Sequence, residues 1–317
     1  MKHLLIGLTL CSMAMTALAG EKVDETLDAD GIDYVKIEHV NGKAKIRGWD
    51  RNQVKVVGEL SDRTEEFIFK RRGNDIIIEV DIGHHVSGWN KWDREEGDDL
   101  EIFMPKSNQV SYTAMNATVD IADVTGGADI ETINGDINAK DLGGRIRIES
   151  VNGDIDAKRL VGNVSIATVN GDITDVSKTA SEATYTSVNG DMEIHSLSKE
   201  FSAETVNGDM DLELADIEEL SLSTVNGNVK ASLNLLKNGD IRANSVGGSI
   251  ELMFQKDVSA RFDIQGHAGG RITNKLTDDE VQRAKYGPSR WLEFSVNGGS
   301  ARVNISTVSG KIKLDTK

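Results

Sequence analysis

Apolar and polar residues alternate with a period of two over most of the chain, and an Asn-Gly pair interrupts the alternation at regular intervals. Around Asn152, apolar residues stand six and four positions before the pair, at Ile146 and Ile148, with polar residues between them. Apolar residues resume three and usually five positions after the Asn, here at Ile155 and Ala157. Period two is typical of β-strands with one buried face. Each unit therefore predicts two short strands joined at an Asn-Gly corner.

The unit repeats along the middle of the chain, and its clearest copies read Val-Asn-Gly-Asp-Ile. Successive Asn positions are separated by 18, 18, 19, 18 and 19 residues. These positions are Asn134, Asn152, Asn170, Asn189, Asn207 and Asn226. A weaker copy follows 21 residues later, with Gly247 at the Asn position, and a Ser or Thr stands two positions before the Asn position in all seven copies. A fixed period of this length indicates stacked units that bury their apolar faces against one another.

We therefore expect an all-β protein: a single-chain parallel β-solenoid (β-helix) with coils of about 18–19 residues and irregular capping ends. An antiparallel meander is the alternative, because Asn-Gly is also a strong hairpin signal. A meander would leave the apolar face of one long sheet uncovered, since no amphipathic helices are evident. In the solenoid, Asn and Gly would form the corner because both tolerate left-handed backbone angles.

Stacked coils would arrange equivalent side chains in columns. The Asn amides would form a hydrogen-bonded ladder from coil to coil. The Asp residues two positions further on would form an outward column with a spacing of about 4.8 Å. These residues are Asp136, Asp154, Asp172, Asp191 and Asp209. Carboxylates at that spacing repel by about 1 kcal/mol in water, so we expect weak divalent cation binding along the column and no other cofactor.

The chain divides into four predicted parts. These are a signal peptide (1–19), a less regular N-terminal β-solenoid part (20–125), the regular repeat array (126–255), and irregular C-terminal coils with a cap (256–317). The first part has a basic start at Lys2, an apolar run, and the small-x-small site Ala17-Leu18-Ala19. Its Cys11 is the only cysteine, so the exported chain would have no disulfide or thiolate site. Export would place the protein in the periplasm, on the outer cell surface or in the medium.

Charge narrows the choice of partner. Without the predicted signal peptide, which holds only Lys2, 35 basic residues stand against 52 acidic ones, a formal charge of −17. Such a charge disfavours nucleic acid and anionic lipid as partners. No later stretch has the eighteen apolar residues expected of a transmembrane helix. The expected partner is a protein or glycan of the cell envelope.

One loop, residues 81–99, concentrates unusual side chains: His84, His85, Trp89 and Trp92. As a binding loop, it would use the two Trp rings as stacking surfaces for sugar or peptide. Its two His residues, with nearby carboxylates, would offer a metal site, although adjacent residues on a strand point to opposite faces. The alternative is a solvated excursion whose Trp residues cover the edge of a coil.

Three features together resemble a known family: the segment Val40 to Asp50 (VNGKAKIRGWD), the strand Leu100 to Pro105, and the repeat array. The chain is similar to the bacterial "putative adhesin" β-strand-repeat family, a domain of unknown function in exported and envelope proteins. The resemblance implies a non-catalytic, adhesin-like or envelope-associated interaction or structural protein, with no catalytic residues to carry over. The alternative is a carbohydrate-active enzyme, a polysaccharide lyase or hydrolase on a parallel β-helix. That enzyme would need a cleft of acids and bases, for which Asp93 and Glu95 of the 81–99 loop, clustered with a basic residue in one groove, are candidates.

Overall fold

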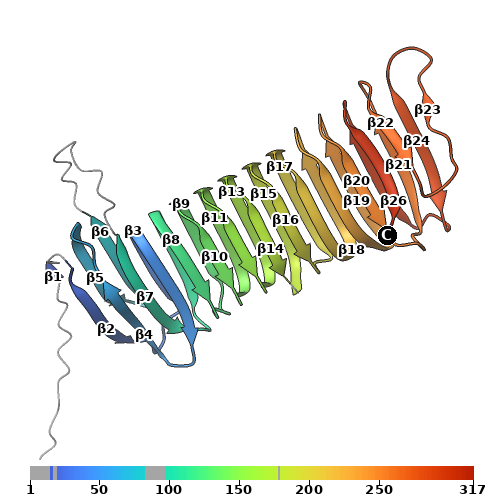
Figure 1. Cartoon of the computed structure of the whole chain (residues 1–317). Coiled ribbons are helices and arrows are strands. Elements are labelled where there is room, and N and C mark those ends of the chain that lie inside the picture. The colour runs from blue at the N-terminus through green and yellow to red at the C-terminus, as the bar shows by residue number, and fades with distance from the viewer. Residues whose placement is uncertain (1–14, 17–19, 83–96, 178) are drawn as a thin grey trace, which may run out of the picture.

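The computed structural model describes residues 15–16, 20–82, 97–177 and 179–317, and they form an elongated all-β molecule (Figure 1). Within these ranges the chain forms strands, turns and bends, and it has no helix that could span a membrane. Most of the predicted signal peptide and most of the 81–99 loop lie outside the described residues.

The strands fall into three groups along the chain. The N-terminal strands are β1 (Met15–Thr16), β2 (Lys22–Asp28), β3 (Tyr34–Trp49), β4 (Gln53–Glu59), β5 (Thr64–Arg72), β6 (Asp75–Ile82), β7 (Asp98–Pro105) and β8 (Gln109–Ala122). The array comprises β9 (Ala128–Asn134), β10 (Ile137–Lys140), β11 (Gly143–Asn152), β12 (Ile155–Lys158), β13 (Val161–Asn170), β14 (Ile173–Ser177), β15 (Thr179–Asn189), β16 (Met192–Ser196), β17 (Glu200–Asn207), β18 (Met210–Thr224), β19 (Val229–Ser245) and β20 (Ile250–Phe254). The C-terminal strands are β21 (Ala260–Gly266), β22 (Arg271–Asn274), β23 (Gln282–Arg283), β24 (Arg290–Val296), β25 (Ala301–Thr307) and β26 (Lys311–Thr316).

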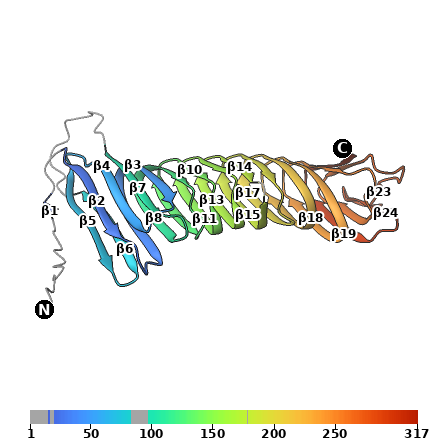
Figure 2. The same ribbon diagram turned by 90° about the horizontal axis from the view of Figure 1, so that it is seen from below.

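Each repeat unit of the array adds one strand to each of two parallel ladders. In the first ladder, β9, β11, β13, β15 and β17 pair in parallel, with Asn134 opposite Asn152 and Asn152 opposite Asn170. In the second, β10, β12, β14 and β16 pair in the same sense. Each pairing therefore joins residues one unit apart, and the units stack in a long row (Figure 2). Array strands that run parallel rule out the antiparallel meander.

The alternate apolar positions predicted from the sequence are buried in both ladders. Ile146 and Ile148 of the first ladder, and Ile155 and Ala157 of the second, are all at most 1% exposed. The buried hydrophobic residues form one continuous cluster that extends from Val23 to Leu314. Burial of this kind contributes roughly 25 cal/mol per Å² of apolar surface, so the interior between the ladders stabilises the molecule without disulfides.

The corner glycines are required for a reason other than the predicted one. None of the six Asn residues has a positive φ, and among the glycines that follow them only Gly135 (141°) and Gly208 (159°, nearly extended) do. The expectation of left-handed corners is therefore wrong. Instead, a Cβ added at Gly153, Gly171 or Gly190 would overlap the carbonyl oxygen of the equivalent glycine one unit earlier. Glycine is needed because adjacent units approach so closely at the corner.

At the N-terminal end, a strand from early in the chain lies out of sequence order. β3 pairs in parallel with β8 along one edge and with β6 and β7 along the other. The layer formed by β3 is therefore inserted between a layer built from β6 and β7 and a layer built from β8. Beyond it, β2, β4 and β7 pair antiparallel, as do β5 with β6 and β1 with β5.

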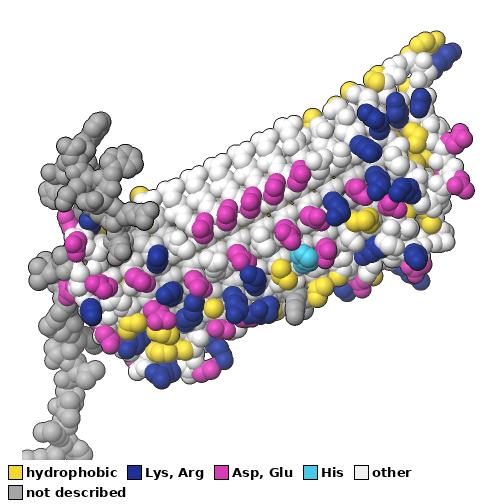
Figure 3. Space-filling model, in the orientation of Figure 1, with side chains coloured by type: hydrophobic (Ala, Val, Ile, Leu, Met, Phe, Trp, Pro, Cys, Tyr) yellow, Lys and Arg dark blue, Asp and Glu magenta, His cyan; other side chains and the backbone are white. Residues whose placement is uncertain are grey.

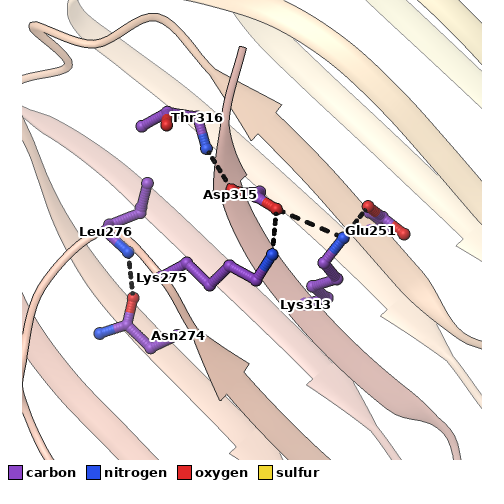
Figure 4. Close-up of polar contacts among 7 residues, drawn as sticks. All are labelled: Glu251, Asn274, Lys275, Leu276, Lys313, Asp315 and Thr316. Carbon is purple, nitrogen blue, oxygen red and sulfur yellow. Dashed lines mark hydrogen bonds and ion pairs between the residues drawn. The ribbon is translucent and has the colours of Figure 1, made fainter.

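The C-terminal end has the same kind of insertion. β25 pairs in parallel with β19 and β21, and β26 pairs in parallel with β20 and β22, so the last layer of the chain lies one layer inside the stack. Side chains of this layer contact the layers on both sides. Lys313 of β26 forms an ion pair with Glu251 of β20, and the Asp315 carboxylate accepts a hydrogen bond from the Lys275 ammonium at 2.9 Å (Figure 4). β24 then pairs antiparallel with β21 and with β23.

The sheet as a whole is therefore mixed. Its array is parallel, as predicted, and the ends, which were expected to be irregular, contain antiparallel pairs. The ends differ because they close the stack: antiparallel strands cover the last parallel layer. The N-terminal edge strand β2, which pairs only with β4 among the described strands, is rich in charged residues, which opposes pairing with strands of other molecules.

Candidate interaction surface

The corners of most array units present the same outward side chains, so equivalent positions form columns along the molecule; the last two units have Asn228 and Ser249 in place of the Asp. Relative to the Asn position, the apolar residue is one position before, the Asp two positions after, and a mixed position lies three before. These columns are the regular features that a partner would meet.

The Asn side chains form a continuous amide ladder. Each Nδ2 donates to Oδ1 of the Asn one unit earlier, at 2.7–3.1 Å, from Asn226 back through Asn207, Asn189, Asn170, Asn152 and Asn134 to Asn116. Asn116 extends the predicted ladder by one layer. The Asn-Gly motif does not reveal it, because alanine, not glycine, follows it.

The Asp residues form a second ladder, visible as a straight row of acidic side chains in Figure 3. In each case Oδ1 accepts a hydrogen bond from the backbone N–H of the equivalent residue one unit later, at 2.7–3.1 Å. The residues are Asp136, Asp154, Asp172, Asp191 and Asp209, and the last one accepts from Asn228. Among the described residues, no group of three or more His, Cys, Asp or Glu side chains could hold a metal ion. Cation binding along this row stays a prediction.

An exposed apolar column runs beside the Asn ladder, and it was not predicted as a surface feature. Its members are 36–49% exposed although all are large and aliphatic. They are Met115, Ile133, Val151, Val169, Val188, Val206, Val225, Val246 and Val308. The signal was present in the alternation itself: if positions six, four and two before the Asn point inward, the position directly before it must point outward.

The N-terminal half of this column borders a groove of about 620 Å³. Its wall on one side is the line of apolar residues from Val40 to Val188, and on the other the residues three positions before each Asn, which include Glu38, Glu131 and Glu149. Arg147 forms ion pairs with Glu131, Glu149 and Asp129. Because this wall has three glutamates and Arg147 pairs with only two of them, the wall keeps a net negative charge.

Beneath the groove lies the column of buried Ser and Thr residues. Thr132 donates from Oγ1 to the carbonyl oxygen of Gly135 at 3.3 Å, and Ser245 donates to Gly248 at 2.7 Å. These two hydroxyls therefore satisfy carbonyl oxygens of the corner from inside, whereas the buried hydroxyls of Ser187, Thr205 and Thr224 have no hydrogen-bond partner among the described residues.

A buried polar cluster lies at the N-terminal end of the groove. The imidazole of His39 lies between the hydroxyl of Tyr112 (Nδ1, 3.1 Å) and the carboxylate of Asp98 (Nε2 to Oδ2, 3.3 Å). Burial would raise the pKa of Asp98, but contacts with His39, the Thr64 hydroxyl and the Ser61 amide outweigh it and lower that pKa. Burial raises the pKa of Tyr112. Both ring nitrogens of His39 face protein groups, so this cluster ties together strands distant in sequence.

A second buried carboxylate lies inside the array. Asp175 is 0% exposed and occupies the inward position held by Ala157 one unit earlier and by Ile194 one unit later. It accepts hydrogen bonds from the hydroxyls of Ser177 and Tyr185, each at 2.5 Å. Burial raises the pKa of Asp175 to about 6, despite these two hydrogen bonds, which lower it.

The four candidate ligand residues of the 81–99 loop, His84, His85, Trp89 and Trp92, lie outside the described residues, as do Asp93 and Glu95 of the enzyme alternative. Their binding role stays a prediction.

Comparison with known proteins identifies relatives of this architecture. The family model described as "Toastrack DUF4097" matches residues 143–315. No curated protein matches the chain. Similar solved structures include a "putative adhesin" from Parabacteroides distasonis (16% identity, 74% of this chain and 94% of that chain covered, TM-score 0.41) and one from Bacteroides fragilis (12%, 93% and 97%, 0.37). Another is a "putative lipid binding protein" from Parabacteroides distasonis (10%, 94% and 98%, 0.32). All three TM-scores are below 0.5, so these likenesses say nothing about function, which must be argued from the geometry of this chain.

Proposed function

The chain belongs to the Toastrack DUF4097 family, and we propose that it is a non-catalytic, exported protein that binds a partner in the cell envelope in an adhesin-like manner. In this proposal the array is a rigid β-solenoid that displays repeated side chains. The resemblance to an adhesin-type repeat family, which was deduced from the Val40 to Asp50 segment, the Leu100 to Pro105 strand and the array, is confirmed by the family match over residues 143–315.

The observation that carries the proposal is the unbroken regularity of the outward columns. The Asn ladder, the Asp row and the apolar column continue through successive units with the same geometry in each. An enzyme concentrates unlike groups at one point, whereas an extended binding surface repeats like groups over a long distance. The surface of this array is of the second kind.

The buried ionisable groups of the described residues also fit a non-catalytic role. His39, Asp98 and Asp175 contact hydroxyls, an amide or one another within the protein. A general base must reach a proton of the substrate, and these groups are directed to internal partners. Export is supported by the predicted signal peptide, and a basic or neutral envelope partner is supported by the acidic composition.

Two measurements test the proposal. Cell fractionation should find the chain in the envelope or the medium, and the purified chain should co-sediment with envelope fragments, whereas an unrelated protein of equal net charge should not. A chain that stays in the supernatant would contradict the binding role. Release of new reducing or unsaturated sugar ends from envelope polysaccharide would contradict the non-catalytic role.

A further inference from the structure

We infer that the groove beside the Asn ladder docks a basic amphipathic helix of a partner protein. The inference rests on the interaction role proposed above and specifies both the surface and the chemistry of the partner.

The groove offers apolar contact and few free hydrogen-bonding groups. Ile133, Val151, Val169 and Val188 line it in consecutive layers, and each is 36–46% exposed. The backbone between them is paired within the parallel ladder. An extended peptide, which binds by adding main-chain hydrogen bonds at a sheet edge, finds no edge here. A partner must therefore form its backbone hydrogen bonds within itself and present apolar side chains.

Acidic residues border the apolar column on one side, and a second acidic row lies across the Asn-Gly corner from it. The border consists of Glu38, Glu131 and Glu149, which line the groove itself. The second row is the Asp row seen in Figure 3, three residues further along each unit, with the Asn and Gly of the corner between it and the apolar column. An apolar strip with acidic residues beyond each of its edges is complementary to a strip of aliphatic residues with Lys or Arg on both flanks. That pattern is the one a basic amphipathic helix carries.

The spacing of the column also favours a helix over an extended chain. Layers repeat about every 4.8 Å, and an α-helix advances about 5.4 Å per turn, so each turn meets about one layer. In an extended strand, residues on one face are about 6.8 Å apart, which falls out of step with the layers after one residue. Six layers, from Val40 to Val188, would accommodate a helix of roughly 16–20 residues.

A second copy of this chain is a poorer occupant of the groove. Two such surfaces face to face would set Glu131 and Glu149 of one molecule, and its Asp row, against acidic groups of the other. Like charges placed opposite each other oppose association. The charge pattern thus selects a basic partner over self-association.

The test uses the purified chain and a synthetic 18-residue helical peptide that has a Leu stripe with Lys on both flanks. A peptide with the same stripe and Glu flanks is the charge control. The chain variant Val151→Thr/Val169→Thr removes apolar surface from the groove, and Thr keeps the β-branched shape suited to a strand. The matched control is Val161→Thr/Val176→Thr, which changes two Val residues of similar or greater exposure (51% and 39%) that do not line the groove.

We expect the Lys-flanked peptide to gain helicity on binding and the Glu-flanked peptide not to bind. The groove variant should weaken the Kd at least tenfold, while the matched control stays within twofold of the native chain. Asp154→Asn/Asp172→Asn, which keeps an oxygen to accept the backbone N–H, should weaken the Kd several-fold.

Equal binding of the peptide to the native chain and to the groove variant would mean unspecific charge attraction and would overturn the inference. Binding of zwitterionic lipid vesicles, but not the peptide, in a groove-dependent manner would overturn it in favour of lipid. A native dimer that the groove variant abolishes would overturn it in favour of a second copy. If the groove variant co-sediments with envelope fragments as well as the native chain does, the interaction role stands and the groove is not its site. If neither chain co-sediments, the proposed function fails independently of the peptide result.

Discussion

Two adjacent glycines in one corner of the array provide a sharp test of how the units stack. Gly247 stands at the Asn position of its unit and Gly248 at the glycine position, and neither has a positive φ. A Cβ added at Gly248 would overlap the carbonyl oxygen of Gly227, far inside the 3.0 Å that Cβ atoms keep from other atoms. A Cβ added at Gly247 would come no closer than 3.3 Å to any atom, the nearest being Oδ1 of Asn226.

The structure sets the size of the effect. To accommodate Gly248→Ala, the corner must move away from the preceding unit by at least about 1.4 Å, because the added Cβ would lie 1.6 Å from the Gly227 oxygen and must be 3.0 Å or more from it. The hydrogen bonds on either side, Gly247 N to Val225 O and Val229 N to Ser249 O, are both 2.8 Å long and would pass out of bonding range. Each lost bond costs about 1–3 kcal/mol, so we expect a loss of about 3 kcal/mol. Gly247→Ala should be neutral or stabilise by about 0.4–1 kcal/mol, because it restricts the unfolded chain.

Urea unfolding followed by circular dichroism measures both variants. Hydrogen exchange should localise the loss in Gly248→Ala to the strands β18, β19 and β20, because the units of such an array depend mainly on their neighbours. A loss of about 3 kcal/mol should lower the melting temperature by about 10 °C. If Gly248→Ala is as stable as Gly247→Ala, close approach of the units is not what requires glycine in these corners.

Three further predictions concern buried charge, the inserted layer and the Asp row. Burial raises the pKa of Asp175 from 3.8 to about 6 in the folded protein, so the free energy of unfolding should fall by about 3 kcal/mol as the pH rises from 3.8 to about 6. Asp175→Asn should remove this pH dependence in urea unfolding. A pH dependence that persists in the variant would show that Asp175 is not its source. Deletion of residues 301–317 removes the layer between β19–β20 and β21–β22. Residues 255–300 then lose the strands they pair with, so limited proteolysis should cleave within this segment. Protection of the segment would show that the inserted layer is not required for its fold. Salt or calcium should raise the melting temperature by screening the Asp row, and the response should shrink in Asp154→Asn/Asp172→Asn; an unchanged response would place the effect elsewhere.

The array could be predicted from the sequence because its information is local and periodic. The alternation around Asn152 identified the buried residues Ile146 and Ile148, and the 18–19-residue period fixed which residues lie opposite one another. Any pairing shifted by one residue would turn the apolar face outward. The Asn ladder follows from the same register. The alternation also implied the exposed apolar column, because it places Val151 and its equivalents on the outward face. The Val-Asn-Gly motif indicated a corner and did not by itself indicate that the Val side chain is exposed.

The ends and the buried clusters could not be predicted, because they depend on contacts between distant parts of the chain. His39 meets Asp98 and Tyr112 only because β3 is inserted between the layers of β7 and β8. Asp175 follows the alternation as an inward position, but an acidic residue there is explained only by Tyr185 and Ser177, whose hydroxyls reach it. Nothing in the local pattern identifies these partners.

The two insertions explain why the motif is found where it is. Val308-Ser309-Gly310 lies 62 residues after Val246-Gly247-Gly248, yet it forms the next layer of the stack, and a Cβ at Gly310 would overlap the carbonyl oxygen of Gly248. The segment 266–271 follows the array in sequence but lies outside that layer, and it reads Gly-His-Ala-Gly-Gly-Arg at the corresponding corner. At the other end, Val40-Asn41-Gly42 belongs to β3, which also has a parallel layer on each side. The glycine of the motif therefore marks layers that have parallel neighbours on both sides, with the exception of the β8 layer, where Ala117 follows Asn116. In a chain of this kind, a motif copy isolated near a terminus predicts an inserted layer.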